Sequence, residues 1–408
     1  MSTKRQPKRV PAAPEPPRAG SPSTATPASV RQVNRAILLN LIRMHQPVSR
    51  IQLSALTGIY RSNVSFIVEE LLAESLVREE RGRPAGRGRV PMFLSLNPDG
   101  CRVVGVSIRA AETVAALAGL TGRVLDSAAF RTPKTPKAWL EHFRRAIEKL
   151  CGGARRWAAG IQHICISVPG MVNHASGEIL WMNALPGYAG FGLREKVQEM
   201  TGVPATVAND CHLATTCERW MGDISAELRN LVFLEVGDVG VGAGMIVNGE
   251  LCTGHNSTFA AEFGHMVVDP SGPPCNCGRR GCWELFVCDR ATWKHFDAST
   301  EFTESRFEEL IRQARGGDRR AVRAFQTTAR RLGLGISNIT LVLNPETVIL
   351  AGRLTEVWGI IAPPIEEALA ALPGRPRLRP ARMPAEELFL HGAIRQALSG
   401  LFARPRLG

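Results

Sequence analysis

The sequence predicts a large α/β domain preceded by a small, mostly helical domain, and three observations support this. Near Asn97, apolar residues at helical spacing give way to short β-rich runs that alternate with helices. The first 100 residues hold 15 Lys and Arg against 7 Asp and Glu, so most of the formal net charge of +13 lies there. Three of the ten cysteines fall between Cys275 and Cys282. In a long chain without a secretion signal, this clustering indicates metal binding and not disulfides.

Size and composition narrow the class of protein. A chain of 408 residues with 44% hydrophobic side chains can bury two or three cores. Charge or glycine interrupts every apolar run before the roughly 20 residues that span a bilayer, and the N-terminus lacks the apolar core of a signal peptide. We therefore expect a cytoplasmic protein with no membrane partner. The basic balance favours an anionic partner such as nucleic acid.

Residues 1–30 predict a disordered tail, because they are rich in Pro, Ala, Ser and Thr and contain almost no large apolar side chain. Four basic residues stand near its start: Lys4, Arg5, Lys8 and Arg9. One interpretation is a basic arm that attracts nucleic-acid phosphates without sequence preference. The alternative is a solvated tail with no specific role, and both fit the composition.

Residues 31–97 are predicted to form a winged helix-turn-helix domain. From Arg31 to Met44, apolar residues recur at helical spacing, and Pro47 ends this first helix. Ser49 then stands as an N-cap for a short second helix, which closes at a glycine turn at Thr57-Gly58. The apolar positions of this second helix are Ile51, Leu53 and Leu56.

The third helix, which Ser62 can cap, follows the glycine turn and completes the helix-turn-helix. Its inner face consists of Val64, Ile67, Val68, Leu71 and Leu72. A turn through Arg81–Arg89 and the alternating residues Met92–Leu96 then predict a β-hairpin wing.

The start of the third helix carries the candidate base contacts. A recognition helix reads base edges in the major groove with polar side chains near its N-terminus. Arg-Gly-Arg segments in the wing suit the narrow minor groove of A·T-rich DNA. The alternative is an ordinary three-helix domain with a polar solvent face. The predicted contacts to double-stranded operator DNA are Ser49, Arg61, Ser62, Asn63, Ser65, Arg81, Arg83 and Arg87.

Residues 98–408 are predicted to form one effector-binding domain with two α/β lobes of similar build. Short β-rich runs alternate here with helical intervals, which is the rhythm of an α/β fold. The predicted strands are 103–108, 114–117, 164–168, 205–207, 231–236 and 348–350. The predicted helices are 138–151, 210–220, 303–316 and 320–343.

The stretch Glu262–Glu284 contains the most specific pattern in the chain. Zinc is bound by four tetrahedral N or S ligands, and one imidazole and three thiolates lie here on a single Gly- and Pro-rich loop. The predicted ligands are His265, Cys275, Cys277 and Cys282. Because the set leaves no open position for water, the predicted Zn²⁺ is structural and not catalytic. The alternative is a chance cluster of buried cysteines.

The motif His-x9-Cys-x-Cys-Gly-x-x-Gly-Cys-x-Glu resembles the signature of the ROK family of repressors, open reading frames and sugar kinases. The N-terminal pattern Ser-Arg-x-x-Leu-x-x-x-Thr-Gly, from Ser49 to Gly58, resembles the helix-turn-helix repressor branch of that family. Supporting motifs are Ser167–Gly170, Leu185–Tyr188, Ala208–Asp210, Asn248-Gly249 and Leu343–Glu346. The resemblance implies two lobes of the actin-like ATPase type, with a hexose-like ligand in the cleft between them.

The resemblance also implies which residues contact the sugar. Asn209 and Asp210 match the Asn-Asp pair of the family, whose Asp is the catalytic base in its kinases. Such groups suit a sugar, because each hydroxyl both donates and accepts hydrogen bonds. An alternative role for Asp210 is a helix N-cap, which does not exclude ligand contact. The implied ligand-binding residues are Asn183, Asn209, Asp210, Glu262, His265 and Glu284.

Three positions depart from the family pattern. Ala184 stands where an asparagine usually precedes Leu-Pro-Gly, with Asn183 one place earlier. The first phosphate loop of the kinases, Asp-x-Gly-Gly-Thr, reads Ser-Ile-Arg-Ala-Ala over 107–111. The second, Gly-Thr-Gly-x-Gly-Gly-Gly, begins with Asp238, whose carboxylate would repel a phosphate. Kinases depend on such loops to hold ATP, so we expect no enzymatic activity.

The leading hypothesis is a sugar-responsive repressor of carbohydrate uptake or catabolism genes. It would bind a palindromic operator as a homodimer or homotetramer, and ligand-driven closure of the cleft would change the spacing of the DNA-binding heads. The second hypothesis is a carbohydrate kinase with a regulatory DNA-binding head. The third is a repressor whose cleft has lost ligand binding and which responds to a protein partner.

The two groups of DNA contacts are expected to respond differently to substitution. Arg61→Ala removes a base contact, so it should cost roughly 1–3 kcal/mol and relax sequence preference at one position. Arg81→Ala removes a minor-groove or phosphate contact, so it should weaken all sequences alike and flatten the salt dependence. Binding assays across operator variants at several salt concentrations distinguish these outcomes. Equal effects of the two substitutions would refute the division of roles.

Overall fold

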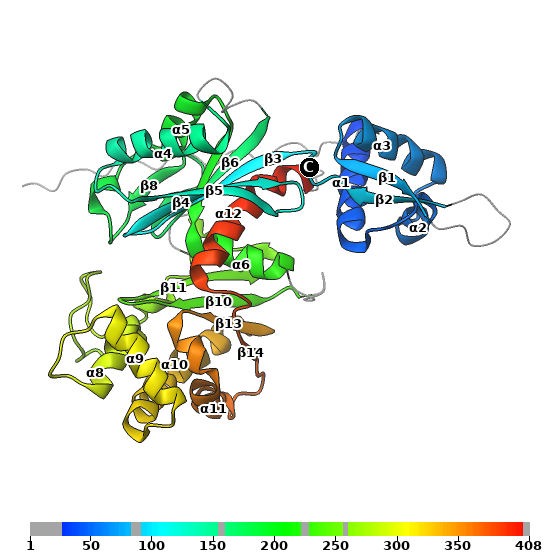
Figure 1. The fold of residues 1–408 in the computed structure, drawn as a ribbon. Coiled ribbons are helices and arrows are strands. Elements are labelled where there is room, and N and C mark those ends of the chain that lie inside the picture. The colour runs from blue at the N-terminus through cyan, green and yellow to red at the C-terminus, as the bar shows by residue number, and fades with distance from the viewer. Residues whose placement is uncertain (1–26, 83–90, 154–159, 222–227, 256–259, 403–408) are drawn as a thin grey trace, which may run out of the picture. The chain divides into compact units, whose positions relative to one another are not determined.

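The computed structural model describes residues 27–82, 91–153, 160–221, 228–255 and 260–402 (Figure 1). It divides into two compact units, one holding most of the N-terminal helices and hairpin and the other consisting of Leu72–Arg78 and Leu96–Gly400. Most of the predicted tail, and Arg83 and Arg87 of the predicted wing, lie outside the described residues. None of the described helices combines the length and the apolarity needed to cross a bilayer.

The first unit has the predicted winged helix-turn-helix order of three helices and a two-stranded hairpin. Its helices bury one face each, through residues such as Leu38, Leu53 and Val68. Arg50 ties the unit together, because its guanidinium bonds to Glu79 at 3.0 Å and to Glu69 at 2.8 Å. The elements are α1 (Pro27–His45), α2 (Arg50–Thr57), α3 (Arg61–Ala73), β1 (Val77–Arg81) and β2 (Met92–Leu96).

Helix α2 has the predicted cap at each of its ends. The Ser49 side chain and Gln52 form a capping box at its start, and Gly58 closes its end with φ of 71°. Ser62 is not the N-cap of the third helix: α3 begins at Arg61, and the Tyr60 carbonyl accepts from the Val64 amide.

Of the three apolar positions in α2, only Leu53 is buried, whereas Ile51 and Leu56 are more than half exposed. The helix has eight residues, so only one turn of it faces the core.

The second unit contains two five-stranded sheets with one topology. Their strand orders are β5-β4-β3-β6-β9 and β12-β11-β10-β13-β14. In each, three antiparallel strands form a meander, and two later strands extend the sheet in parallel on the other side of the first strand. This repeated order confirms the prediction of two lobes of similar build.

The strands of the first sheet are β3 (Arg102–Ile108), β4 (Glu112–Gly119), β5 (Val124–Arg131), β6 (Ile161–Val168) and β9 (Ala205–Asn209). Those of the second are β10 (Leu231–Val236), β11 (Val241–Val247), β12 (Glu250–Leu251), β13 (Thr347–Ala351) and β14 (Arg377–Pro380). A separate small hairpin joins β7 (Met171–Asn173) and β8 (Glu178–Trp181).

Helices cover the outer face of each sheet. Residues of α4 (Pro136–Leu150) and α5 (Leu193–Thr201), led by Trp139 and Phe143, pack on the first sheet. The second is covered by α8 (Asp289–Phe296), α9 (Glu304–Arg315), α10 (Arg319–Leu343) and α11 (Trp358–Leu369). Shorter helices are η1 (Pro186–Tyr188), η3 (Phe263–His265), α7 (Glu284–Val287) and η4 (Arg353–Val357).

Two helices pack on the inner face of the second sheet, α6 (Asp210–Met221) and α12 (Ala385–Phe402) (Figure 1). Cys211 and Ala214 of α6 share a core with Phe389 of α12 and Phe233 of β10. A Cβ at Gly392 would lie 2.6 Å from the Leu213 carbonyl oxygen, so the two helices approach closely. The start of α6 is thereby fixed between the two sheets.

Gly335 of α10 is expected to resist replacement. A Cβ there would lie 2.0 Å from the indole of Trp283, which is fully buried. Gly335→Ala should lower the free energy of unfolding by about 1–3 kcal/mol through overpacking, although Gly→Ala within a helix ordinarily stabilises by about 1 kcal/mol. Gly359→Ala in α11, where a Cβ meets nothing within 4 Å, is the control and should be neutral or stabilising. Urea denaturation measures both, and equal effects would contradict the packing argument.

Candidate functional site

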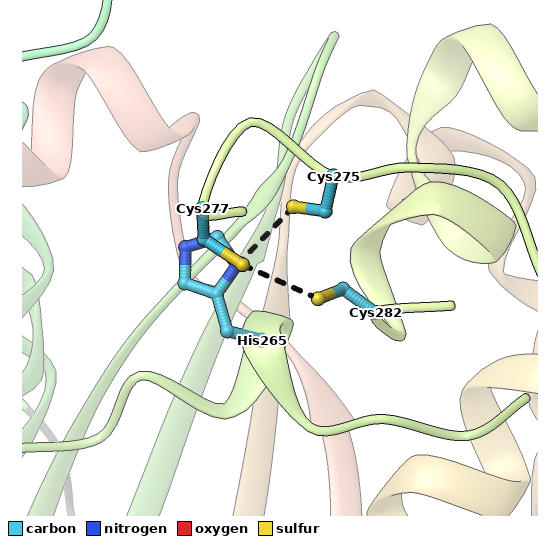
Figure 2. A group of neighbouring side chains, drawn as sticks. All are labelled: His265, Cys275, Cys277 and Cys282. Atoms are coloured by element: carbon cyan, nitrogen blue, oxygen red, sulfur yellow. Dashed lines mark hydrogen bonds between the residues drawn. The ribbon is translucent and has the colours of Figure 1, made fainter. Parts of the chain in front are cut away.

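Four side chains converge on the loop that runs from Glu262 to Glu284. The ligand atoms of His265, Cys275, Cys277 and Cys282 all lie within 4.8 Å of one another, and Figure 2 shows the four side chains turned towards a common centre. The Cys277 and Cys282 sulfurs are 3.5 Å apart, and the Cys275 sulfur is 3.7 Å from His265 Nδ1. Tetrahedral zinc with Zn–S bonds of about 2.3 Å separates its ligand atoms by roughly 3.5–3.8 Å. The cluster therefore fits a four-coordinate metal ion.

Arg279 favours the thiolate form of one cysteine in this cluster, Cys277. Burial raises the pKa of Cys277, but hydrogen bonds with the backbone and side chain of Arg279, and with the side chains of Cys275 and Cys282, lower that pKa to about 6. A thiolate is the form that ligates metal. The sequence pattern contained Arg279 next to the ligands, but the spacing alone gave no sign of this hydrogen bond.

Glu284 links the cysteine cluster to the neighbouring cleft. One carboxylate oxygen lies 3.0 Å from the Cys275 sulfur and 3.3 Å from His265 Nδ1. Burial alone would raise the pKa of Glu284, but these two hydrogen bonds lower it overall. A Cβ at Gly240 would come within 2.9 Å of the other oxygen, so a side chain there would displace the carboxylate. The contacts with Cys275 and His265 hold the carboxylate beside the cluster.

The second unit contains a cleft of about 680 Å³ between its two lobes. It is lined from the first lobe by the ends of β6 and β9 and from the second by the loop between β10 and β11. All six predicted ligand-binding residues line it: Asn183, Asn209, Asp210, Glu262, His265 and Glu284. The structure thus gathers residues that are up to 101 positions apart in the chain, and their contact with a ligand stays a prediction.

Asn209 and Asp210 make different hydrogen bonds at the start of α6. The Asn209 side chain accepts a hydrogen bond from the His212 amide at 3.0 Å and donates one to the Gly170 carbonyl at 3.1 Å. Asn209 therefore serves as the helix cap. Asp210 accepts from the next amide, that of Cys211, at 2.8 Å. Burial raises the pKa of its carboxyl group, and the charge of Arg109 opposes that rise.

The cleft also contains residues that the sequence patterns did not indicate. Burial raises the pKa of Asp210 and raises that of Glu235 to about 7, and the charge of Arg109, directly after β3, opposes both rises. Its guanidinium stacks 5.0 Å over Phe389 and lies 3.5 Å from Glu386. His174 and His212 stack with ring centres 5.7 Å apart. These residues come from separate segments, so only the fold brings them together.

Charged residues within and beside segments 107–111 and 238–244 form ion pairs. Asp238 receives two hydrogen bonds of 3.0 Å from the Arg290 guanidinium. Asp289, which is 2% exposed, pairs with Arg353 at 3.2 Å. Arg109, Asp238, Asp289 and Arg353 line one adjoining hollow of about 680 Å³. Fixed charges of both signs therefore line this hollow.

The predicted DNA contacts are placed at the start of α3, before α2 and at the end of β1. Arg61, Ser62 and Asn63 are exposed in the first turn of α3, and Ser65 is half-buried. The Ser49 side chain is engaged in the capping box, which gives it a structural role in addition to any contact with DNA. Arg81 is exposed at the end of β1.

Comparison with known proteins decides the family. Residues 103–381, well over half of the chain, match the profile of the ROK family. The chain belongs to the ROK family. The xylose repressor of Bacillus subtilis is 30% identical over 328 residues, which cover 80% of this ROK chain and 84% of that repressor. The DNA-binding transcriptional dual regulator NagC of Escherichia coli is 26% identical over 349 residues, which cover 83% and 85%.

Solved structures place both units of this ROK protein within the known fold. A ROK family transcriptional regulator described as a homologue of the E. coli MLC protein superposes with a TM-score of 0.78 at 26% identity, over 92% of this chain and 98% of its own. A ROK hexokinase from Thermus thermophilus superposes with a TM-score of 0.59 at 27% identity, over 72% and 97%. The predicted fold class, an actin-like two-lobed domain after a winged helix-turn-helix, is confirmed.

The cysteine cluster is expected to hold about one zinc per chain. Cys277→Ser should remove most of that metal and lower the free energy of unfolding by more than about 2 kcal/mol, because metal binding contributes directly to folding. Cys252→Ser, outside the cluster, is the control and should keep its zinc. Elemental analysis and thermal denaturation measure both. A metal-free wild-type protein whose stability matches that of Cys277→Ser would disprove the site.

Proposed function

We propose that this chain is a sugar-responsive, DNA-binding transcriptional repressor that holds structural zinc and transfers no phosphate. The observation that carries the proposal is the contrast within one cleft. The polar residues suited to a sugar are gathered there, whereas both phosphate loops are altered and flanked by ion pairs. The names of the xylose repressor and NagC, which align over both units, support the same function.

The cleft offers acceptors and donors in the mixture that sugar hydroxyls require. Asp210, Glu262 and Glu284 bring three carboxyl groups to one cavity, and Asn183 adds an amide. A hydroxyl can donate to a carboxylate and accept from an amide or imidazole at the same time. Because the Asp210 carboxyl is buried, little of its side-chain freedom is lost when a sugar binds.

The zinc ion would hold residues of the cleft wall in position and would take no part in a reaction. His265, Cys275, Cys277 and Cys282 would hold the ion, and all four coordination positions would then be filled by protein. The ion supplies a rigid closed centre when bound. The ion would fix the loop that carries His265 and leads into Glu284, and both residues line the wall of the cleft. The zinc site would therefore contribute to ligand binding only by holding side chains in position.

Phosphoryl transfer lacks its usual parts in this cleft. In sugar kinases, backbone amides and a metal-binding carboxylate hold the ATP phosphates. The first loop here has Arg109-Ala110-Ala111 after Ser107, and the Ser107 side chain is buried. The second loop carries Asp238, bonded to Arg290. Without a site for the transferred phosphate, Asp210 is left to accept a hydrogen bond from the ligand.

Sugar and DNA are coupled if they prefer different arrangements of the lobes. Sugar draws the two walls of the cleft together, and DNA binding by a homodimer or homotetramer depends on the spacing of two recognition helices. A ligand shifts such an equilibrium only by its differential affinity for the two states. We expect the coupling to fall in the usual range of about 1–3 kcal/mol.

Asp210→Asn is expected to separate sugar sensing from DNA binding. The change preserves shape but removes the charge, so it should weaken sugar binding while sugar-free DNA affinity stays near that of the wild type. Calorimetry with hexoses, pentoses and N-acetylhexosamines gives the first quantity, and fluorescence anisotropy on selected duplexes gives the second. Asp126→Asn, on exposed β5, is the control and should change neither.

Two results would overturn the proposal. If Asp210→Asn abolished DNA binding without any sugar present, Asp210 would be a structural residue of α6. If the wild-type protein turned over ATP with one of these sugars in a coupled assay, the chain would be a kinase with a DNA-binding head.

A further inference from the structure

The C-terminal half of α10 exposes three large apolar side chains. Leu334 is 41% exposed, Leu341 65% and Val342 81%. The other large apolar side chains that are exposed in the second unit, such as Leu125 and Val267, are isolated from one another in the sequence. Single exposed apolar residues are ordinary on a protein surface, whereas a contiguous group of them marks an interaction site. The end of α10 is therefore a candidate docking surface.

The three side chains share one face of the helix with Asn338, which is also exposed. Residues spaced at i, i+4, i+7 and i+8 lie on the same side of an α-helix, and 334, 338, 341 and 342 have this spacing. The opposite side of α10, which includes Ile336, is buried in the core of the second lobe. We call the four exposed residues the α10 stripe.

The charges of α10 all lie before the stripe. Residues 332–343 contain no charged side chain. The charged residues of the helix are five arginines in the preceding segment: Arg319, Arg320, Arg323, Arg330 and Arg331. An uncharged, apolar surface favours a protein partner with a surface of the same kind, because apolar area is then removed from water on both sides.

A second copy of this chain is a partner that fits the α10 stripe. In a dimer with twofold symmetry, the same patch occurs on both sides of the interface and must be complementary to itself. If two α10 helices cross antiparallel with Asn338 at the twofold axis, Leu334 of each copy lies opposite Val342 of the other, since both are four residues from Asn338. Apolar side chains then meet apolar side chains on both sides of the axis. The amide of Asn338, which both donates and accepts hydrogen bonds, meets its own copy.

The charges beyond the stripe are complementary in the same arrangement. Arg330 and Glu346 are each eight residues from Asn338, and both are exposed. Among the residues that the structure describes, neither belongs to an ion pair. The amides of Arg229 and Asn230 donate to Oε1 of Glu346 at 3.0 and 2.9 Å, which fixes this carboxylate just beyond the end of α10. An antiparallel pair of helices therefore brings a cation of one copy towards an anion of the other at both ends of the stripe.

We propose that the α10 stripe is the surface through which two copies of this chain associate, with their α10 helices antiparallel and Asn338 at the twofold axis. This inference deepens the proposed function and rests on it for its consequence, since a palindromic operator is bound by two recognition helices and the second copy supplies the other one. The association itself is measured without sugar or DNA, so it is tested independently of that function.

Leu341→Asp in the full-length protein tests the apolar contact. Because Leu341 is exposed, the folded chain tolerates the change, whereas the dimer would have to bury an unpaired carboxylate in each copy. Analytical ultracentrifugation over a range of protein concentrations should show a dimer dissociation constant raised about tenfold or more. Leu125→Asp, which adds the same charge at an exposed apolar position of β5, is the matched control and should leave that constant unchanged. Thermal denaturation verifies that both variants are folded.

Asn338→Cys tests the geometry. A cysteine at the twofold axis lies next to its own copy, and two cysteines can form a disulfide when their Cα atoms are about 4.4–6.8 Å apart. Treatment with oxidised glutathione should therefore give a covalent dimer on a non-reducing gel. Arg323→Cys, about four turns earlier on the same helix, is one control. The wild-type protein, whose ten native cysteines set the background, is the other. Neither control should form this product above that background.

An unchanged dissociation constant in Leu341→Asp, or the absence of a cross-link through Asn338→Cys, would overturn the inference and leave the proposed function standing. A wild-type protein that stays monomeric at every concentration would also overturn it, and the stripe would then belong to a different partner. A protein that dimerises through the stripe but binds neither sugar nor DNA would instead contradict the proposed function and leave the inference standing.

Discussion

The cleft depends on the convergence of His265, Cys275, Cys277 and Cys282, because the loop that carries them has almost no other regular structure. From Glu262 to Glu284 the chain forms two isolated β-bridges and one short helix, η3, before α7 begins. Backbone hydrogen bonds also join the two halves of the loop, from the Val268 amide to the Gly281 carbonyl and from the Trp283 amide to the Met266 carbonyl. A zinc ion among the four side chains would add a link between His265 and a stretch of chain ten or more residues away. Glu284 and His265, which border this cluster, both line the cleft.

The positions of the residues on the opposite wall depend on a different feature, the junction of β9 with α6. Asn209 caps the helix and bonds Gly170, so the adjoining Asp210 is delivered to the cleft on a rigid turn. Arg109 then offsets part of the charge of Asp210 and Glu235, which burial would otherwise force towards their protonated forms. Arg109 thus stabilises the acidic side of the cleft.

The sequence predicted those parts of the fold whose signals are local. The helix-turn-helix, the strands of the two sheet centres and the four metal ligands each lie within one short segment, where spacing is informative. Strand β5 was missed because it lies at a sheet edge with only Ala128 buried, so it shows no alternation. Helix α11 contains Pro363 and Pro364, which ordinarily end a helix. The roles of Arg109 and Glu235 could not be predicted, because residues from distant segments become neighbours only through the paired sheets.

The central claim, that one chain couples a sugar to DNA through its cleft, is tested most directly by reciprocity. Calorimetry would measure the affinity of the full-length protein for its sugar, alone and saturated with a duplex selected from random sequence by the protein itself. Linkage requires that DNA change the sugar affinity by the same factor by which sugar changes the DNA affinity. Our account predicts two equal factors, each clearly different from one. A sugar that binds with the same affinity whether or not DNA is present would contradict it.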